Sequence, residues 1–419
     1  MQRFKLISLL CLFPTAYAYA EVDTTPGIFD SRFHTLETRL EGNFYAPAVI
    51  PLNGEDLIAI SFDEIGEDRS YLRYSLVHCN ADWQPSALVE AEYIDGFNEG
   101  RIENYEYSQL TKTHYTHYSL FIPNDDIRPT KSGNYLLRIY DENDPERTLL
   151  QTRFMVSEYS MKINAEITSR TDVDYNEAHQ QISIVVDADR TPVQNIMGDL
   201  TVSVTQNGRL DNAVLVSRPS RFAGKIAYYE HLRPLIFPAG NEYRRVEFTA
   251  VNIPLKGVER TDYFEPFYHV TLIPDEVRSY QPYAYDQTQH GRFLVREYNS
   301  SQSEIEADYV VVHFSLPCDE IEGYDLFLDG DFTLRRFNPD SRLVYNRATG
   351  AYEASILLKQ GAYNYQILAV PEGTTVGRTD IIEGDKYQTV NEYVIAVYHR
   401  QSGERYDRLT ATATFYSGK

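Results

Sequence analysis

Two histidines and one acidic turn are the residues whose spacing most suggests a metal site. His114 and His117 lie three positions apart, but their segment is typical of a β-strand, where residues three apart point to opposite faces. We therefore expect both to be ordinary polar positions. Residues 141–146, Asp-Glu-Asn-Asp-Pro-Glu, offer oxygen ligands for calcium but lack the glycine and the distal glutamate of an EF-hand loop. This segment is predicted to be a solvated strand connection, and neither a metal nor a cofactor is expected.

Cysteine chemistry is limited by position and number. Cys11 follows Leu10, where a lipoprotein signal requires a small residue, so lipid attachment is not expected. Cys79 and Cys318 lie far apart, and no Cys-x-x-Cys motif or Cys/His cluster has zinc spacing. Two buried free thiols are expected, with one long-range disulfide as the alternative in an oxidising compartment.

Catalytic motifs are missing from the sequence. It contains no Gly-x-Ser-x-Gly, no His-Glu-x-x-His and no phosphate-binding glycine loop. The paired carboxylates of a glycosidase cannot be chosen among 61 acidic residues, because their diagnostic property is a distance in space. No catalytic residue is predicted, and no small-molecule substrate is expected.

Trp83 is the only tryptophan and stands beside a predicted strand end. Such a residue is usually a core anchor, and the alternative is the centre of a protein interface. Trp83 is therefore the one candidate for partner binding.

The N-terminus is typical of a cleavable signal peptide. Arg3 and Lys5 precede the apolar run 6–13, and Ala18-Tyr19-Ala20 fits signal-peptidase cleavage, which makes residues 1–20 the predicted signal. The apolar run is shorter than the roughly 20 residues that cross a bilayer as a helix. The mature chain is expected beyond the inner membrane, without an integral membrane segment.

Net charge excludes one class of partner. Without Arg3 and Lys5, 37 of the 39 basic residues remain against 61 acidic ones, a net charge of −24. Such a chain repels phosphate backbones and anionic lipid surfaces, so nucleic-acid binding is excluded. The charge favours solubility, and a basic patch on a partner is the alternative.

Short segments that mix tyrosine with aliphatic residues predict strands throughout the chain. Alternation is clearest at 57–62, 71–77, 135–140 and 182–186. Residues 200–205 and 213–216 flank Asn207-Gly208, which predicts a β-hairpin whose return strand begins late. No long helical periodicity is present, and about one helical turn is expected near 86–92.

This pattern predicts an all-β fold of tandem immunoglobulin-like or early-set β-sandwich domains. A strand-like ending at 152–156 and the polar run 299–304 suggest two boundaries. The predicted domains are an N-terminal sandwich at 21–158, a middle sandwich at 159–302 and a C-terminal sandwich at 303–419.

Several motifs, taken in order, resemble a known family. They are His78-Cys79-Asn80-Ala81-Asp82-Trp83-Gln84-Pro85-Ser86, Glu92-Tyr93-Ile94-Asp95-Gly96-Phe97, Tyr115-Thr116-His117-Tyr118, residues 121–129, residues 132–137, residues 206–213 and residues 239–244. Together they resemble the type IX secretion system plug proteins of the Bacteroidota, from about Phe33 to about Asp407.

The resemblance implies a periplasmic, non-enzymatic β protein that is peripherally associated with the outer membrane. Its implied partner is the giant outer-membrane β-barrel translocon, whose periplasmic opening the plug closes when no substrate occupies the pore. The family supplies no catalytic residues, and it does not identify the contact residues.

Three other functions stay open at this stage. Residues 325–332 and 351–365 weakly resemble the early-set sandwich that binds starch or glycogen, but glucan binders use exposed tryptophans and this block has none. A carbohydrate-binding envelope protein is therefore the main alternative. An enzyme with unrecognised residues and a general envelope assembly factor are the other two.

Overall fold

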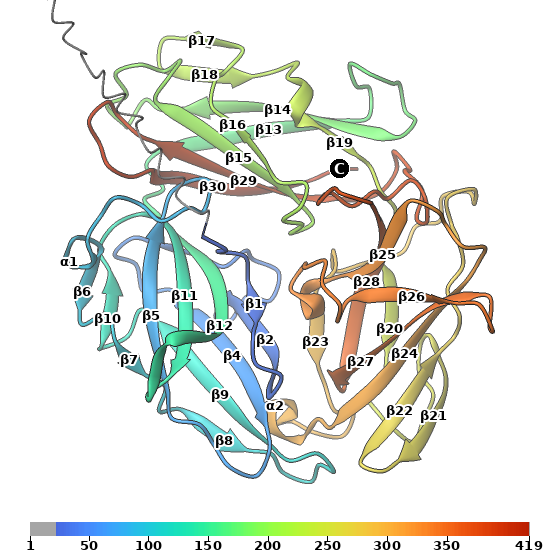
Figure 1. The fold of residues 1–419 in the computed structure, drawn as a ribbon. Helices are drawn as coiled ribbons and strands as arrows, with labels where there is room; N and C mark the ends of the chain where they lie inside the picture. The colour runs from blue at the N-terminus through green and yellow to red at the C-terminus, as the bar shows by residue number, and fades with distance from the viewer. Residues whose placement is uncertain (1–21, 419) are drawn as a thin grey trace, which may run out of the picture.

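The computed structural model describes residues 22–418, and nearly all regular structure in them is β-strand. The strands surround three separate hydrophobic cores (Figure 1), which confirms the all-β fold class. We call the three units sandwiches 1, 2 and 3. The predicted signal peptide lies outside the described residues. Among residues 22–418, no helix has the length and apolar character needed to cross a membrane.

Sandwich 1 packs two antiparallel sheets around a core that runs from Phe33 to Val156. One sheet has the order β1-β12-β11-β5-β7 with β3 beside β12, and the other has the order β2-β4-β9-β8. A short β10-β6 pair and helix α1 lie at one side. The elements are β1 Gly27–Ile28, β2 Phe33–Leu40, β3 Val49–Pro51, β4 Ile58–Ile65, β5 Leu72–Cys79, α1 Glu90–Tyr93, β6 Ile94–Gly96, β7 Gly100–Arg101, β8 Tyr105–Tyr107, β9 Tyr115–Ile122, β10 Ile127–Pro129, β11 Gly133–Asp141 and β12 Asp144–Ser157.

Sandwich 2 is built from two separate stretches of the chain. Its sheets have the orders β13-β14-β18-β17, with β19 beside β14, and β16-β15-β29-β30. The elements are β13 Lys162–Thr168, β14 His179–Asp187, β15 Leu200–Gln206, β16 Val214–Val216, β17 Arg221–Ala223, β18 Ile226–Tyr229, the 3-10 turn η1 Arg233–Leu235, β19 Ile236–Pro238, β29 Glu392–His399 and β30 Arg408–Tyr416.

Sandwich 3 contains one continuous nine-stranded sheet whose strands contribute to a single core. The order is β20-β28-β25-β26-β27-β24-β22-β21, with β23 beside β28. The elements are β20 Arg244–Glu247, β21 Val258–Phe264, β22 Phe267–Leu272, β23 Phe293–Val295, α2 Ser303–Glu306, β24 Tyr309–Pro317, β25 Tyr324–Asp329, the 3-10 turn η2 Asp331–Thr333, β26 Arg342–Asn346, β27 Ala351–Lys359 and β28 Gly361–Pro371.

Strand pairing divides the chain differently from the boundary predicted at 302/303. Strand β15 pairs with β29 along its whole length, and Tyr393, Ile395 and Val397 belong to the core of sandwich 2. Strands β20 to β23 lie before residue 303 but pair within sandwich 3. Sandwich 3 is thus inserted into sandwich 2, because the final strands return to complete the earlier sheet.

Alternation explains why these segments become strands with one buried face. Along β15, Leu200, Val202 and Val204 are fully buried in the core, whereas Ser203 and Thr205 point to the other face. The predicted hairpin is present: Asn207 and Gly208 both adopt positive φ, and β15 pairs with β16 from Val204 and Val214 onward.

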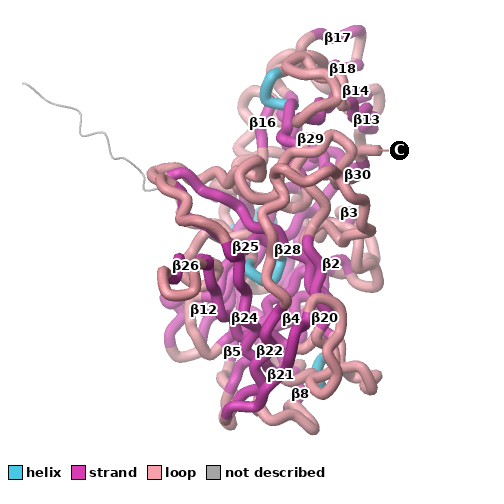
Figure 2. The backbone as a smooth tube through the Cα atoms, turned by 90° about the vertical axis from the view of Figure 1, so that its right-hand side faces the viewer, coloured by secondary structure: helices cyan, strands magenta, loops and turns pink. Residues whose placement is uncertain are grey.

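Sandwiches 1 and 3 lie side by side, and sandwich 2 lies across one end of both (Figures 1 and 2). All three pairs of sandwiches are in contact. The outward face of the β15-β29 sheet therefore looks into the junction of the whole molecule.

Candidate functional site

A cavity of about 310 Å³ lies where the three sandwiches meet. Sandwich 2 supplies the outward face of β15 and β29, sandwich 1 supplies parts of β2 and β12 together with Trp83, and sandwich 3 supplies β23 and the segment around η2. A second hollow of about 500 Å³ continues between sandwiches 1 and 3 and shares Leu36, Phe293 and Leu334 with the first. We call the first hollow the central cavity.

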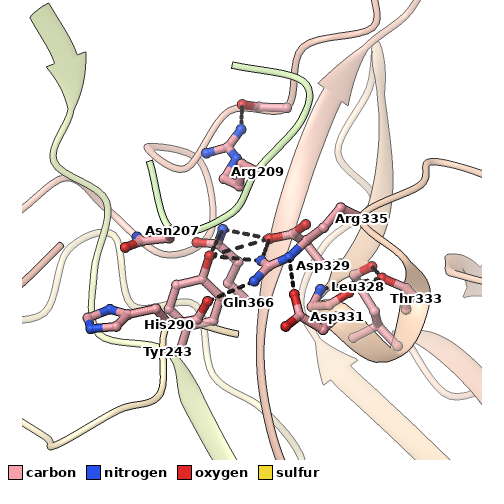
Figure 3. A network of polar contacts seen from close by, with 12 residues as sticks. Asn207, Arg209, Tyr243, His290, Leu328, Asp329, Asp331, Thr333, Arg335 and Gln366 are labelled. Carbon is pink, nitrogen blue, oxygen red and sulfur yellow. Dashed lines mark hydrogen bonds and ion pairs between the residues drawn. The ribbon is translucent and has the colours of Figure 1, made fainter. Parts of the chain in front are cut away.

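Arg335 anchors a polar network beside the central cavity (Figure 3). Its guanidinium contacts Asp329 Oδ2 and Asp331 Oδ1, both at 2.9 Å, and donates to the His290 carbonyl oxygen at 2.7 Å. The Tyr243 hydroxyl accepts a further hydrogen bond from Arg335. Burial alone would lower the pKa of Arg335, but Asp329 and its neighbours hold that pKa well above its ordinary value. The group is a permanently charged anchor.

The Asn-Gly hairpin of sandwich 2 is docked against sandwich 3 beside this network. Arg209 pairs with Asp211 at 2.6 Å and donates to the Gly377 carbonyl oxygen at 2.8 Å. Asn207 donates to the Asn391 side chain at 2.7 Å. The turn of the predicted hairpin is therefore part of an internal contact.

Sandwiches 1 and 3 are joined through the carboxylate of Asp63. It receives hydrogen bonds of 2.6 Å from Lys359, Tyr309 and His117. The Lys359 and Asp63 side chains are each 1% exposed. Burial raises the pKa of Asp63, but Lys359 and His117 lower it by more, so the pKa lies below its ordinary value. Burial lowers the pKa of Lys359, and Asp63 opposes that shift. The two side chains form an ion pair that is shielded from water.

The motif around Trp83 forms the contact between sandwiches 1 and 2. Asn80 accepts a hydrogen bond from Arg400, and the Ala81 amide donates to Asp407 at 2.9 Å. Farther along, Arg408 pairs with Glu158 at 2.7 Å. These contacts give the motif a structural role that the sequence did not indicate.

Trp83 itself lies at the wall of the central cavity and is half-buried. Its backbone is left-handed, with φ of 65°, and the guanidinium of Arg153 stacks 4.4 Å from the centre of its ring. Partner binding by Trp83 stays a prediction.

The histidine pair considered as metal ligands is divided between different partners. His114 contacts Glu67 at 2.8 Å outside β9, and His117 contacts the buried Asp63. Residues 141–146 cover the last residue of β11, the two-residue connection 142–143 and the start of β12, and Glu142 pairs with Arg73. Residues 22–418 contain no group of three or more His, Cys, Asp or Glu side chains that could hold a metal ion.

Cys79 and Cys318 are free thiols in the structure. Cys79 is fully buried, and burial raises its pKa to about 12, whereas Cys318 is half-buried. The expectation of two free thiols therefore matches this structure, although only Cys79 is completely enclosed.

The carboxylates near the junction are held in ion pairs and hydrogen bonds. The carboxylates around Arg335, Arg209 and Lys359 are each paired with a cation. The Lys359–Asp63 pair joins sandwiches 1 and 3, whereas the pairs of Arg335 lie within sandwich 3 and the Arg209–Asp211 pair lies within the hairpin of sandwich 2. The glucan-binder-like stretch 325–332 contributes Asp329 and Asp331 to this buried network. The ion pairs that join different sandwiches are Lys359–Asp63 between 1 and 3, Arg292–Glu392 between 3 and 2, and Arg408–Glu158 between 2 and 1.

Comparisons with known proteins identify the family of this chain. Residues 33–158 match the family described as the type 9 secretion system plug protein first domain. A crystal structure of a hypothetical protein from Parabacteroides merdae matches with 39% identity and a TM-score of 0.93, over 95% of this chain and 100% of that one. The chain belongs to the type IX secretion system plug family. The similarity of this plug-family chain to the Parabacteroides protein includes all three sandwiches.

Two other solved structures match too poorly to carry an argument. They are an alkylpurine DNA glycosylase of Pseudomonas fluorescens bound to abasic-site DNA (TM-score 0.16, 10% identity, 30% of each chain) and a collagen adhesin from S. aureus (TM-score 0.12, 8% identity, 92% of each chain). No curated protein matches the plug-family chain.

Proposed function

We propose that this plug-family chain is a periplasmic, non-catalytic protein that binds the outer-membrane β-barrel of the type IX secretion system and seals its periplasmic opening. Membership of the plug family carries the proposal. The predicted signal peptide and peripheral association with the outer membrane agree with that location.

The fixed arrangement of the sandwiches supports a sealing role. Membrane barrels reach about 36 strands in the largest known case, and a lumen of that width leaks unless a body covers it. A cover needs shape and a specific interface of roughly 1,000 Å² or more, but no reaction. Three sandwiches joined by buried charged contacts provide a body that keeps its shape under load.

One end of the molecule is the surface best suited to contact the barrel. It is formed by the loop between β8 and β9 and by the turn between β21 and β22, at the bottom of Figures 1 and 2. Leu110 in that loop is 94% exposed, and Phe264 at that turn is 62% exposed. Large exposed apolar side chains on neighbouring loops commonly mark a protein interface. We call this region the loop end.

The decisive experiment is recovery of the barrel with the tagged plug-family chain after mild crosslinking and detergent extraction. The unsubstituted chain should recover one large outer-membrane barrel, and Leu110→Asp and Phe264→Asp should each recover several-fold less. Phe222→Asp is the matched control, because Phe222 is 55% exposed on β17 at the opposite end.

The outcomes test the plug function and the contact surface separately. If the unsubstituted chain recovers no barrel, the plug function is wrong. If all three variants recover the barrel equally, the loop end is not the contact surface. Deleting the gene should admit large antibiotics without reducing barrel abundance; a loss of barrel abundance would point to an assembly factor instead.

A further inference from the structure

The stacked pair of Trp83 and Arg153 gives the central cavity a wall of unusual chemistry. The guanidinium carbon of Arg153 lies 4.4 Å from the Trp83 ring centre, and both side chains line the cavity. The left-handed φ of Trp83 costs backbone energy, since bulky residues rarely adopt it. Strain of this kind is concentrated where a side chain is held for binding.

Arg153 differs from the other arginines of the cavity because it has no carboxylate partner. Arg39 pairs with Glu37, Arg292 with Glu392, and Arg335 with two aspartates. Arg153 donates only to the carbonyl and hydroxyl oxygens of Thr24. Within residues 22–418, no carboxylate lies within ion-pair distance of Arg153, and its Nη1 has no hydrogen-bond acceptor.

This lone charge is costly where it lies. Burial lowers the pKa of Arg153 to about 10, because few compensating charges surround it. A half-buried cation of this kind gains stability when an anion comes within contact distance.

The floor of the cavity supplies further hydrogen-bonding groups. Ser203 and Thr205 project from the outward face of β15 into the cavity. Their hydroxyl groups make no hydrogen bond to any residue in the described part of the chain. Apolar side chains such as Phe44, Phe293 and Leu334 line the remaining walls. Among the described residues, the lining of the cavity thus combines one guanidinium without a carboxylate partner, two hydroxyl groups without a hydrogen bond, and an apolar and aromatic enclosure.

We propose that the central cavity binds a carboxylate carried on an apolar or aromatic body, with Arg153 as its counter-charge. The Trp83 ring and the apolar walls contact the body of the ligand, and the free hydroxyls of β15 take part of its polar end. A volume of about 310 Å³ suits a small aromatic acid or the last residues of a peptide. The carboxylate can come from a free small molecule or from the carboxyl end of a chain. This site is independent of the barrel contact at the loop end.

Trp83 makes the test direct, because it is the only tryptophan in the protein. The chain produced without residues 1–20 is titrated with phenylacetate while tryptophan fluorescence is recorded. A saturable change in Trp83 emission is expected with phenylacetate. The neutral isostere phenylacetamide should bind with an affinity at least about ten-fold lower than that of phenylacetate, because it cannot form an ion pair with the guanidinium.

Three variants assign the interaction to the cavity. Arg153→Met keeps the apolar stem and should weaken phenylacetate binding about ten-fold or more. Thr205→Val is nearly isosteric and should weaken binding by a smaller factor without disturbing the fold. Arg347→Met is the control, because Arg347 is 84% exposed and lies outside both cavities, so binding should be unchanged.

Short peptides ending in phenylalanine distinguish the two sources. Tight binding of the free-acid peptide but not of its amide identifies a chain end, and binding of phenylacetate alone identifies a small molecule. Equal affinity for phenylacetate and phenylacetamide, or no change in Trp83 emission with any of these ligands, overturns the proposal. Equal binding by Arg347→Met, Thr205→Val and Arg153→Met overturns it as well.

Discussion

Asp63 and Lys359 illustrate how much of this molecule depends on single charges that water does not reach. Lys359→Met would leave the Asp63 carboxylate buried without its cation, and removal of one partner of a buried pair costs about 3–5 kcal/mol. We therefore expect a large loss of unfolding free energy in urea. Arg342→Met is the control, because Arg342 and Asp325 are 50% and 41% exposed, and such pairs contribute about 0–1 kcal/mol.

A second substitution tests the cause of that loss. Asp63→Asn in the Lys359→Met background removes the uncompensated charge and should restore part of the stability. If the double variant is less stable than Lys359→Met by the full cost of the Asp63→Asn single change, the two side chains act independently and the interpretation fails.

His78 makes stability depend on pH. Its ring is 1% exposed and bridges Ser86 and the Ser132 carbonyl oxygen as a neutral group, and burial lowers its pKa from 6.5 to about 4. Between these values the unfolded chain binds more protons, so this contribution is complete above about pH 6.5 and is lost as pH falls toward 4. The loss is about 2 kcal/mol at pH 4.5.

A variant without a titrating ring checks this contribution. His78→Gln should show a shallower decrease of unfolding free energy than the unsubstituted chain between neutral pH and about pH 4.5. Parallel curves for the two proteins would assign the acid sensitivity to other groups. The half-buried His290, whose pKa is also lowered to about 4 by burial, contributes in the same direction.

Single residues were only partly predictable from the sequence. His114 and His117 are separated as expected, but not for the expected reason: His114 lies just before β9, so the two are not on opposite faces of one strand. Arg335 and Arg153 were missed, because an arginine in a strand or turn reads as a surface residue until its neighbours in space are known. Asp331 and Asp329 lie only four and six positions before Arg335, but no sequence pattern indicates that these pairs are buried. The cavity beside Arg153 was equally hidden, because residues of all three sandwiches line it.

At the scale of elements, the inserted topology predicts which fragments fold. Residues 240–390 include the whole core of sandwich 3, which runs from Val246 to Ile382. Residues 303–419 lack β20 to β23 and carry β29 and β30 without the partner strand β15. The first fragment should give a dispersed amide spectrum and cooperative unfolding, and the second should give neither. The reverse result would favour a boundary near 302/303.

The positions of the strands were predicted better than the pairing between strands. The alternation in β4, β5, β11, β14 and β15 marked each strand, because burial on one face leaves a local pattern. The pairing of β15 with β29 has no such signature in the sequence, because any strand of suitable length and composition could form hydrogen bonds with the same edge of β15. The polar run at 299–304 therefore looked like a domain linker, although it leads into α2 within sandwich 3.

At the scale of the whole molecule, the contacts between sandwiches predict a fixed shape. The carboxylates of Asp63 and Glu392, which join sandwich 3 to sandwiches 1 and 2, are each at most 2% exposed within their ion pairs, and salt screens buried pairs weakly. Solution scattering curves at low and high salt should coincide and agree with the arrangement in Figure 1. A larger radius of gyration at high salt would show that the sandwiches separate.

The return of β29 and β30 to sandwich 2 also has a consequence for synthesis. Chains emerge from the ribosome with the amino end first. Strand β15 is therefore made long before its partner β29, which is near the end of the chain. A product that stops before Glu392 leaves one edge of β15 without its partner strand. Unpaired strand edges form hydrogen bonds with strands of other chains. Premature termination is therefore expected to yield an aggregation-prone species instead of a shorter working protein, which couples completeness of the polypeptide to its solubility.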